Sequence, residues 1–325
     1  MGRLIMNLKY KLGLSLALAV LVSAISSTYA AAAESDNTVI IKDFDINFSA
    51  DGEAKTYYSY RDKKLPDIFV KSEHHDEINL THSDKMWDIE PQYSPDSKKI
   101  AYSSGKSMKH LDLWVMNADG SHKTKLHDDP NSAIAVAWSP DGSKIAFASI
   151  FGKKKTANIF VINADGTHLT NLTQDIPGTA TSPSWSHDGA RILYVHSETE
   201  KGQQDIYIMA ADGSHKTRLT NTSIKEAGPV FTPDGSMIVY TGYDGEHSQL
   251  FAISAHGQQE GDVGLSLTQG LHEDAYFASF SPNGAHLIYS VGDWTNGFAM
   301  AHIPTPHAKT GIPHKDGHHQ NGHHK

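Results

Sequence analysis

One short phrase recurs six times along the chain, and it constrains the fold more than any other feature of the sequence. It combines an aromatic residue, Ser or Thr, a variable residue, Asp or Asn, and Gly or Ser, and begins at Phe48, Tyr93, Trp138, Trp185, Phe231 and Phe280. The second residues of successive phrases are 45 to 49 positions apart. That period is typical of a β-propeller, in which each repeat forms one four-stranded blade. The sequence therefore predicts an all-β, six-bladed β-propeller.

The order of segments inside a repeat predicts four antiparallel strands per blade. An alternating apolar strand follows each phrase, as in residues 144–149, and a third strand such as residues 159–162 ends in a second turn. A short fourth strand ends in Leu-Thr or a variant. Because Gly adopts positive φ and Asp bonds nearby backbone, we interpret the recurrent Asp-Gly pairs as hairpin turns rather than metal sites. The aromatic residues that open the phrases are expected in the core between blades.

These motifs resemble the PD40 repeat of the TolB-type, WD40-like propeller family, and the resemblance covers residues 44–303. It implies the propeller fold, but it is much less specific for function, because such propellers serve many tasks. Full-length TolB proteins carry an additional α/β domain before the propeller. Here about ten residues separate a predicted leader from the first repeat, so we expect the chain to lack that domain.

The last repeat contains only three recognisable strands before Pro304 and Pro306 end it. Its outer strand can come from the other end of the chain, where residues 38–41 are strongly β-prone. Pairing the two chain ends would remove the exposed sheet edges of an open ring. We therefore expect an N-terminal strand to close the propeller.

The N-terminus has the pattern of a secretory signal peptide. Arg3, Lys9 and Lys11 precede an apolar run from residue 12 to 25, and small residues follow at 30–33. The run is shorter than the roughly 20 residues that span a bilayer, which favours cleavage over anchoring. With no cysteine, a lipid anchor and disulfides are excluded. We expect a signal peptide at 1–33, a propeller at 34–304, and a soluble monomer in the periplasm or the medium, without membrane insertion after cleavage.

Beyond the last strand, residues 305–325 are rich in His, Gly and Lys and show no apolar pattern. We predict that this tail is disordered and binds Zn or Ni weakly; an inert solvated tail is the alternative. We expect the protein to require no cofactor. The candidate ligands are His314, His318, His319, His323 and His324.

Acidic residues gather in the segments that connect one blade to the next. The chain has a net charge of −9, which becomes −12 when the three basic residues of the leader are removed, and such a field disfavours nucleic acid. Loops that converge on the funnel of a propeller suit recognition of a protein or peptide partner in the cell envelope. We interpret the following residues as exposed partner-binding acids of this face: Asp84, Asp88, Glu90, Asp128, Asp129, Asp175, Glu226, Glu273 and Asp274.

An enzyme is the alternative. There is no Gly-x-Ser-x-Gly motif, and only three arginines, Arg61, Arg191 and Arg218, follow the leader, so we assign no catalytic residues. The family also resembles oligogalacturonate lyase propellers, which implies a metal-dependent lyase or hydrolase acting on acidic saccharides. Its metal ligands would include His82 and His272, with His196 or His247 in outer loops as further candidates. No spacing ties these histidines together, and we favour the binding module.

Overall fold

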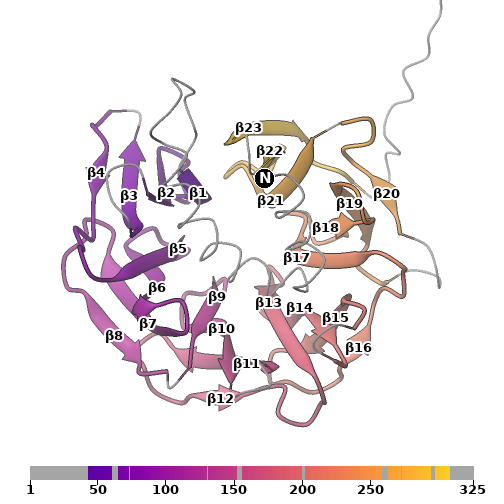
Figure 1. Ribbon diagram of the computed structural model, residues 1–325, viewed down its shortest axis with the longest axis horizontal. Coiled ribbons are helices and arrows are strands. Elements are labelled where there is room, and N and C mark those ends of the chain that lie inside the picture. Colours follow the sequence, from indigo (N-terminus) through magenta and orange to yellow (C-terminus); the bar gives the residue numbers. More distant parts are fainter. Residues whose placement is uncertain are drawn as a thin grey trace, which may run out of the picture.

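A computed structural model describes residues 43–60, 65–72, 74–129, 131–151, 156–199, 202–257, 263–271, 273–293 and 297–307. The described strands form six antiparallel sheets that follow one another around a ring (Figure 1). Five sheets have four strands in sequence order from the centre outward, and the sixth has three. The six-bladed propeller predicted from the repeat is therefore confirmed. No described helix is long and apolar enough to cross a lipid bilayer.

The strands of the first three blades have these bounds. Blade 1 contains β1 (Asp43–Phe48), β2 (Ala54–Ser59), β3 (Asp67–Ser72) and β4 (Ile78–Asn79). Blade 2 contains β5 (Trp87–Tyr93), β6 (Lys99–Ser107), β7 (His110–Asn117) and β8 (Thr124–His127). Blade 3 contains β9 (Ala133–Trp138), β10 (Lys144–Phe151), β11 (Thr156–Asn163) and β12 (Thr170–Asn171).

The remaining blades continue the ring. Blade 4 contains β13 (Thr179–Trp185), β14 (Arg191–Ser197), β15 (Asp205–Ala210) and β16 (Thr217–Arg218). Blade 5 contains β17 (Lys225–Phe231), β18 (Met237–Tyr243), β19 (Ser248–Ser254) and β20 (Leu265–Ser266). Blade 6 contains β21 (Asp274–Phe280), β22 (His286–Asp293) and β23 (Gly297–Pro304). The segment expected to close blade 6, residues 38–41, lies outside the described residues.

Each recurrent phrase forms the hairpin between the first two strands of its blade. In blade 3 the Ser139 hydroxyl donates to Asp141 Oδ1 at 2.6 Å and accepts the Lys144 N–H at 2.9 Å. Gly142 has a φ of 69°, which a side chain would strain. Hydrogen bonds from Ser139 and Ser143 lower the pKa of Asp141 to about 2. The Asp-Gly pairs are therefore turns, as predicted.

The Leu-Thr pair that ends a repeat also has a structural role. Its Thr hydroxyl accepts the backbone N–H of the third strand in blades 1, 3, 4 and 5, at 2.8 to 3.0 Å, through Thr81, Thr173, Thr220 and Thr268. Thr173 and Thr220 are no more than 2% exposed. The hydroxyl thus satisfies a buried donor where the short fourth strand ends.

Neighbouring blades are joined through the aromatic residues of the phrase. Trp185 is buried, and its Nε1 donates to the Ala137 carbonyl of the preceding blade at 3.2 Å. Trp138 reaches the Gln92 carbonyl in the same way at 3.1 Å. The expected place of these aromatic residues between blades is confirmed.

A second joint between blades lies on the face that carries the Asp-Gly turns. The third residue of a phrase faces the Gly of the next: a Cβ built on Gly142 would lie 3.7 Å from Pro95, and one on Gly52 would lie 3.0 Å from Pro282. The first and last blades therefore touch at this face. In blade 4, His187 replaces the proline, and its Nε2 donates to the Thr232 carbonyl of blade 5 at 3.1 Å.

The chain continues past the predicted end of the propeller at residue 304. Thr305 is 6% exposed, its backbone N–H donates to the Ala285 carbonyl at 3.0 Å, and its hydroxyl donates to the Gly284 carbonyl at 2.7 Å. His307 Nδ1 lies 3.2 Å from Asp234 Oδ2 in the turn of blade 5. These residues of the predicted tail thus pack on the ring.

Candidate functional site: the central channel

Every inner strand contains an irregularity at the same place. The pairing with the second strand shifts register within β1, β5, β9, β13, β17 and β21. At these bulges five residues, each three positions before the aromatic residue of its phrase, have φ between 51° and 55°: Asp45, Glu90, Ala135, Ser182 and Gly228. Bulges re-aim side chains and are frequent beside functional sites.

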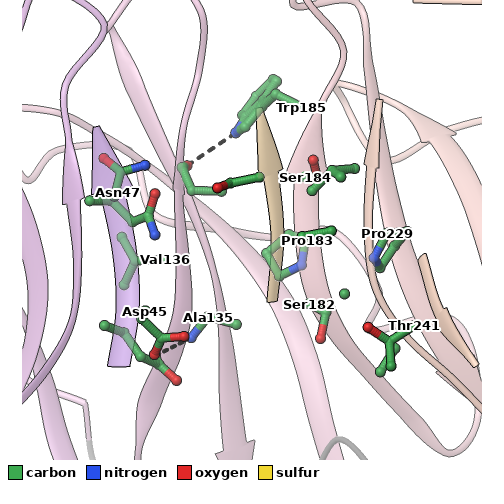
Figure 2. Close-up of a pocket in the computed structure, with 18 of the residues that line it drawn as sticks. Asp45, Asn47, Ala135, Val136, Ser182, Pro183, Ser184, Trp185, Pro229 and Thr241 are labelled. Atoms are coloured by element: carbon green, nitrogen blue, oxygen red, sulfur yellow. Dashed lines mark hydrogen bonds between the residues drawn. The ribbon is translucent and has the colours of Figure 1, made fainter. Parts of the chain in front are cut away.

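The bulged inner strands surround a central channel with a cavity of about 440 Å³. All six blades contribute to its wall, and Figure 2 shows side chains from several of them around the opening. Loop residues contribute little to this lining, since most of it belongs to the inner strands themselves. A ligand in the channel would therefore meet residues that the sheets hold in place.

The wall differs from one side of the ring to the other. Blades 1 and 2 each place an acid at the bulge and an amide two residues later, as Asp45 with Asn47 and Glu90 with Gln92. Blades 3 to 5 contribute no acid to the described lining. Their lining residues include small or ring-shaped ones, namely Ala135, Ala137, Ser182, Pro183, Ser184, Gly228 and Pro229, beside larger ones such as Ile134, Trp185, His187 and Phe231. The small side chains leave room opposite the two acids.

Asp45 and Glu90 are half-buried in the channel wall. Burial and the nearby charge of Glu90 raise the pKa of Asp45 to about 8. Burial raises the pKa of Glu90 to about 7, although its Oε2 accepts the Ala135 N–H at 2.6 Å. Near neutral pH the two carboxyl groups therefore hold at least one proton between them.

Several predicted partner-binding acids lie inside the blades. The expectation that they are exposed loop charges is wrong for Asp88, Asp129, Glu226 and Asp274, which are 0% to 6% exposed. Glu226 accepts hydrogen bonds from Thr222 and the Ile206 N–H at 2.7 and 3.1 Å, and Asp274 accepts the Ser248 N–H at 2.8 Å. Burial raises the pKa of Glu226 to about 7 and that of Asp88 to about 6. These four acids bond their surroundings within the blades.

The other predicted acids are accessible, in three different settings. Asp128 and Asp175 are exposed, and their carboxylates lie 2.9 Å from the ammonium groups of Lys125 and Lys216. Asp84 and Glu273 are exposed on connections between blades. Glu90 belongs to a strand rather than to a connection, and it is the one member of the predicted set that lines the channel.

The candidate metal-ligating histidines that lie within the described residues do not come together in one site. His82 is exposed, and its backbone N–H donates to Asn79 Oδ1 at 2.9 Å. His196 is buried in β14 rather than in an outer loop, and its Nε2 donates to the Pro177 carbonyl at 2.8 Å. Among the residues described, no three His, Asp or Glu side chains form a metal-binding cluster. His272 and the candidate ligands of the tail, His314, His318, His319, His323 and His324, fall outside the described ranges.

Sequence reasoning missed Asp45. It treated the connections as the source of the funnel acids and did not consider the inner strands. A usable signal was present, because Asp45-x-Asn47-Phe48 and Glu90-x-Gln92-Tyr93 repeat an acid, an amide and an aromatic residue at identical spacing. Aligning the six phrases backward by three residues finds both acids.

Comparison with known proteins places this ring among related propellers. The family described as the TolB beta propeller domain matches residues 38–152 and 130–322. A putative TolB from Agrobacterium tumefaciens is similar in structure, with a TM-score of 0.59, 18% identity, and coverage of 80% of this chain and 90% of that one. Among curated protein sequences, none matches this chain significantly.

Two further solved structures share the propeller fold. TolB from Acinetobacter baumannii gives a TM-score of 0.56 and 21% identity, with 68% of this chain and 56% of that one covered. An oligogalacturonate lyase in complex with manganese gives a TM-score of 0.61 and 16% identity, with 84% and 78% covered. Identities this low report a shared fold alone.

Proposed function

Because the chain belongs to the TolB beta propeller domain family, we propose that it is an exported binding module that recognises a protein or peptide partner through its central channel. The observation that carries this proposal is the channel itself, where the inner strands of all six blades converge around a cavity of about 440 Å³. A cavity of this size on rigid strands suits a side chain or short segment of a partner. Asp84 and Glu273 would contribute acidic contacts around it.

The N-terminal pattern supports a place for this function outside the cytoplasm. A secretory leader without a following cysteine is typical of proteins released into the periplasm or the medium. We therefore propose a partner in the cell envelope, and exclude nucleic acid as a ligand because the net charge is strongly negative.

Blocking the channel tests the proposal. Ser184 lies in β13, lines the channel and is half-buried, so Ser184→Trp should fill the opening from the small-residue side. We expect capture of envelope proteins by the immobilised variant to fall at least tenfold for every partner that the native ring enriches. Leu169→Trp is the matched control, since Leu169 is 41% exposed outside the channel. Equal capture by Ser184→Trp and the native protein would contradict binding in the channel.

The lyase alternative makes a different prediction. A metal-dependent enzyme should retain a stoichiometric metal ion, lose it in His82→Ala or His272→Ala, and degrade oligogalacturonate. Metal analysis of the purified protein therefore separates the two functions. Only the fold likeness to a lyase favours the enzyme, and the binding module remains our proposal.

A further inference from the structure

The described lining of the channel contains two carboxyl groups and no lysine or arginine. Among the described residues, Asp45 and Glu90 are the only acids of this lining, and His187, in the turn of blade 4, is its only imidazole. Neither carboxylate forms an ion pair with a residue of the described ranges. Bulges at positive φ turn both residues at the same position of adjacent blades, so two acceptors from different sheets line one wall.

A second observation also points to a polar ligand. Thr181 lines the channel next to the bulge of blade 4 and is 2% exposed, yet its hydroxyl has no hydrogen-bond partner in the part of the chain that is placed. A buried hydroxyl without a partner is costly, and a polar ligand would relieve that cost. This residue lies on the small-residue side of the channel.

We propose that Asp45 and Glu90 together bind one primary ammonium group, carried by a lysine side chain of the peptide ligand. This inference rests on the proposed function and names the chemistry of its ligand. A guanidinium prefers a bidentate contact with both oxygens of one carboxylate. Glu90 Oε2 already accepts the Ala135 N–H, so a bidentate contact with Glu90 would have to share that oxygen, and the remaining acceptors come from two residues on adjacent blades. An ammonium, with three donors around one nitrogen, fits that arrangement better.

Binding of the ammonium group should be coupled to proton release. Tyr58 of β2 and Tyr60 just after it interact with the pair, and their pKa values are raised mainly by burial, so both stay neutral. The other titratable groups of the described lining are Tyr276 of β21 and His187 in the turn of blade 4. The charge balance of the pair therefore depends on its own two carboxyl groups. Because an ammonium is held best by two carboxylates, affinity should increase as pH rises from 6 to 8.5, where lysine stays charged.

The test uses two capped tripeptides, acetyl-Gly-Lys-Gly-amide and acetyl-Gly-norleucine-Gly-amide, which differ in the ammonium group. Binding to the mature protein is measured by NMR titration at pH 6 and 8.5. We expect the lysine peptide to bind at least tenfold more tightly than the norleucine peptide at pH 8.5, and less selectively at pH 6. The isosteric double variant Asp45→Asn/Glu90→Gln should bind both peptides equally.

A matched control removes two carboxylates elsewhere. Glu53 and Glu246 are exposed outside the channel, so Glu53→Gln/Glu246→Gln changes the net charge equally and should keep the preference for lysine. Equal binding of the two peptides to the native protein, or a preference that survives Asp45→Asn/Glu90→Gln, would overturn the ammonium site. Circular dichroism of each variant establishes that it is folded.

A competition experiment with spermidine distinguishes a peptide from a polyamine as the source of the ammonium group. Displacement of the lysine peptide by spermidine only at higher concentration supports a peptide ligand. Tighter binding of spermidine keeps the ammonium site but overturns its peptide source. Conversely, selectivity for lysine combined with unchanged envelope capture by Ser184→Trp would leave the site standing while the proposed function fails.

Discussion

A positive φ costs glycine little conformational free energy and every other residue more, so its repeated occurrence needs a reason. In this ring the cost recurs at one position of the inner strand, and only Gly228 among the five occupants avoids it. The bulge bends the strand where the blades converge, and its backbone geometry requires the positive φ whatever side chain occupies the position. At Asp45 and Glu90 the same geometry carries carboxyl groups into a partly desolvated space, which disfavours their charged forms.

The first prediction concerns the pH dependence of stability at this pair. The folded protein keeps protons on Asp45 and Glu90 that the unfolded chain releases from about pH 4 upward, since burial raises their folded pKa values to about 8 and 7. This contribution to stability is complete below pH 4 and declines as pH rises toward 8. Asp45→Asn should therefore raise the free energy of unfolding at pH 8 by about 1–3 kcal/mol, discounted for partial solvation.

Thermal melting between pH 5 and 8 measures this effect. The melting temperature of Asp45→Asn should vary less across the window than that of the native protein. Glu246→Gln serves as the control, because Glu246 is exposed. A native melting curve that rises steadily from pH 5 to 8 and is matched by Asp45→Asn would contradict the prediction.

At the scale of the single blade, hydrogen bonds to side chains decide where strands begin and end. The turn phrase and the Leu-Thr pair could both be recognised in the sequence, because each is a short pattern that recurs with the blade. The bulge could not be recognised, because Asp45, Ala135 and Ser182 share a backbone conformation and no chemistry. Buried acids were misplaced for a related reason: the partners of Glu226 and Asp274 come partly from neighbouring strands.

The Leu-Thr pair leads to a prediction about the third strand. Thr173 is 0% exposed and accepts the Ile159 N–H at 2.9 Å. Thr173→Val keeps the shape but leaves that buried N–H without an acceptor, which should lower the free energy of unfolding by about 1–3 kcal/mol. Thr170→Val, three residues earlier in the chain and exposed, should change it by less than about 0.5 kcal/mol. Equal urea denaturation curves for the two variants would argue against this role.

At the scale of the whole molecule, the number of blades could be predicted from the six phrases and their period, because a ring brings all six phrases into equivalent places. The contacts across the ring could not be predicted, since no local pattern records which residues face one another over the channel. Asp45 and Thr181 illustrate this: they are separated by more than two blades in sequence and line the same cavity. The leader and the distal part of the tail stay predictions, because residues 1–42 and 308–325 lie outside the description.

Closure of the ring by the N-terminus is the third prediction. Blade 6 has three described strands, whereas the other five have four. Deleting residues 34–42 from the mature protein should expose sheet edges and promote aggregation, which size-exclusion chromatography would detect. The matched truncation removes residues 308–325 and should leave the elution profile unchanged. If both truncated proteins elute and melt as the mature chain does, another segment closes the ring.

The histidine joint between blades 4 and 5 has a consequence for the behaviour of the ring in acid. His187 faces a carbonyl oxygen, which can only accept, so its Nε2 carries hydrogen whether the imidazole is neutral or charged. The described contacts between the phrases of the other blades involve proline, serine or glycine, which do not titrate in this range. We therefore expect mild acidification to change the electrostatic potential of the channel while the ring around it keeps its diameter. The molecule resembles a rigid collar whose lining loses negative charge as the pH falls.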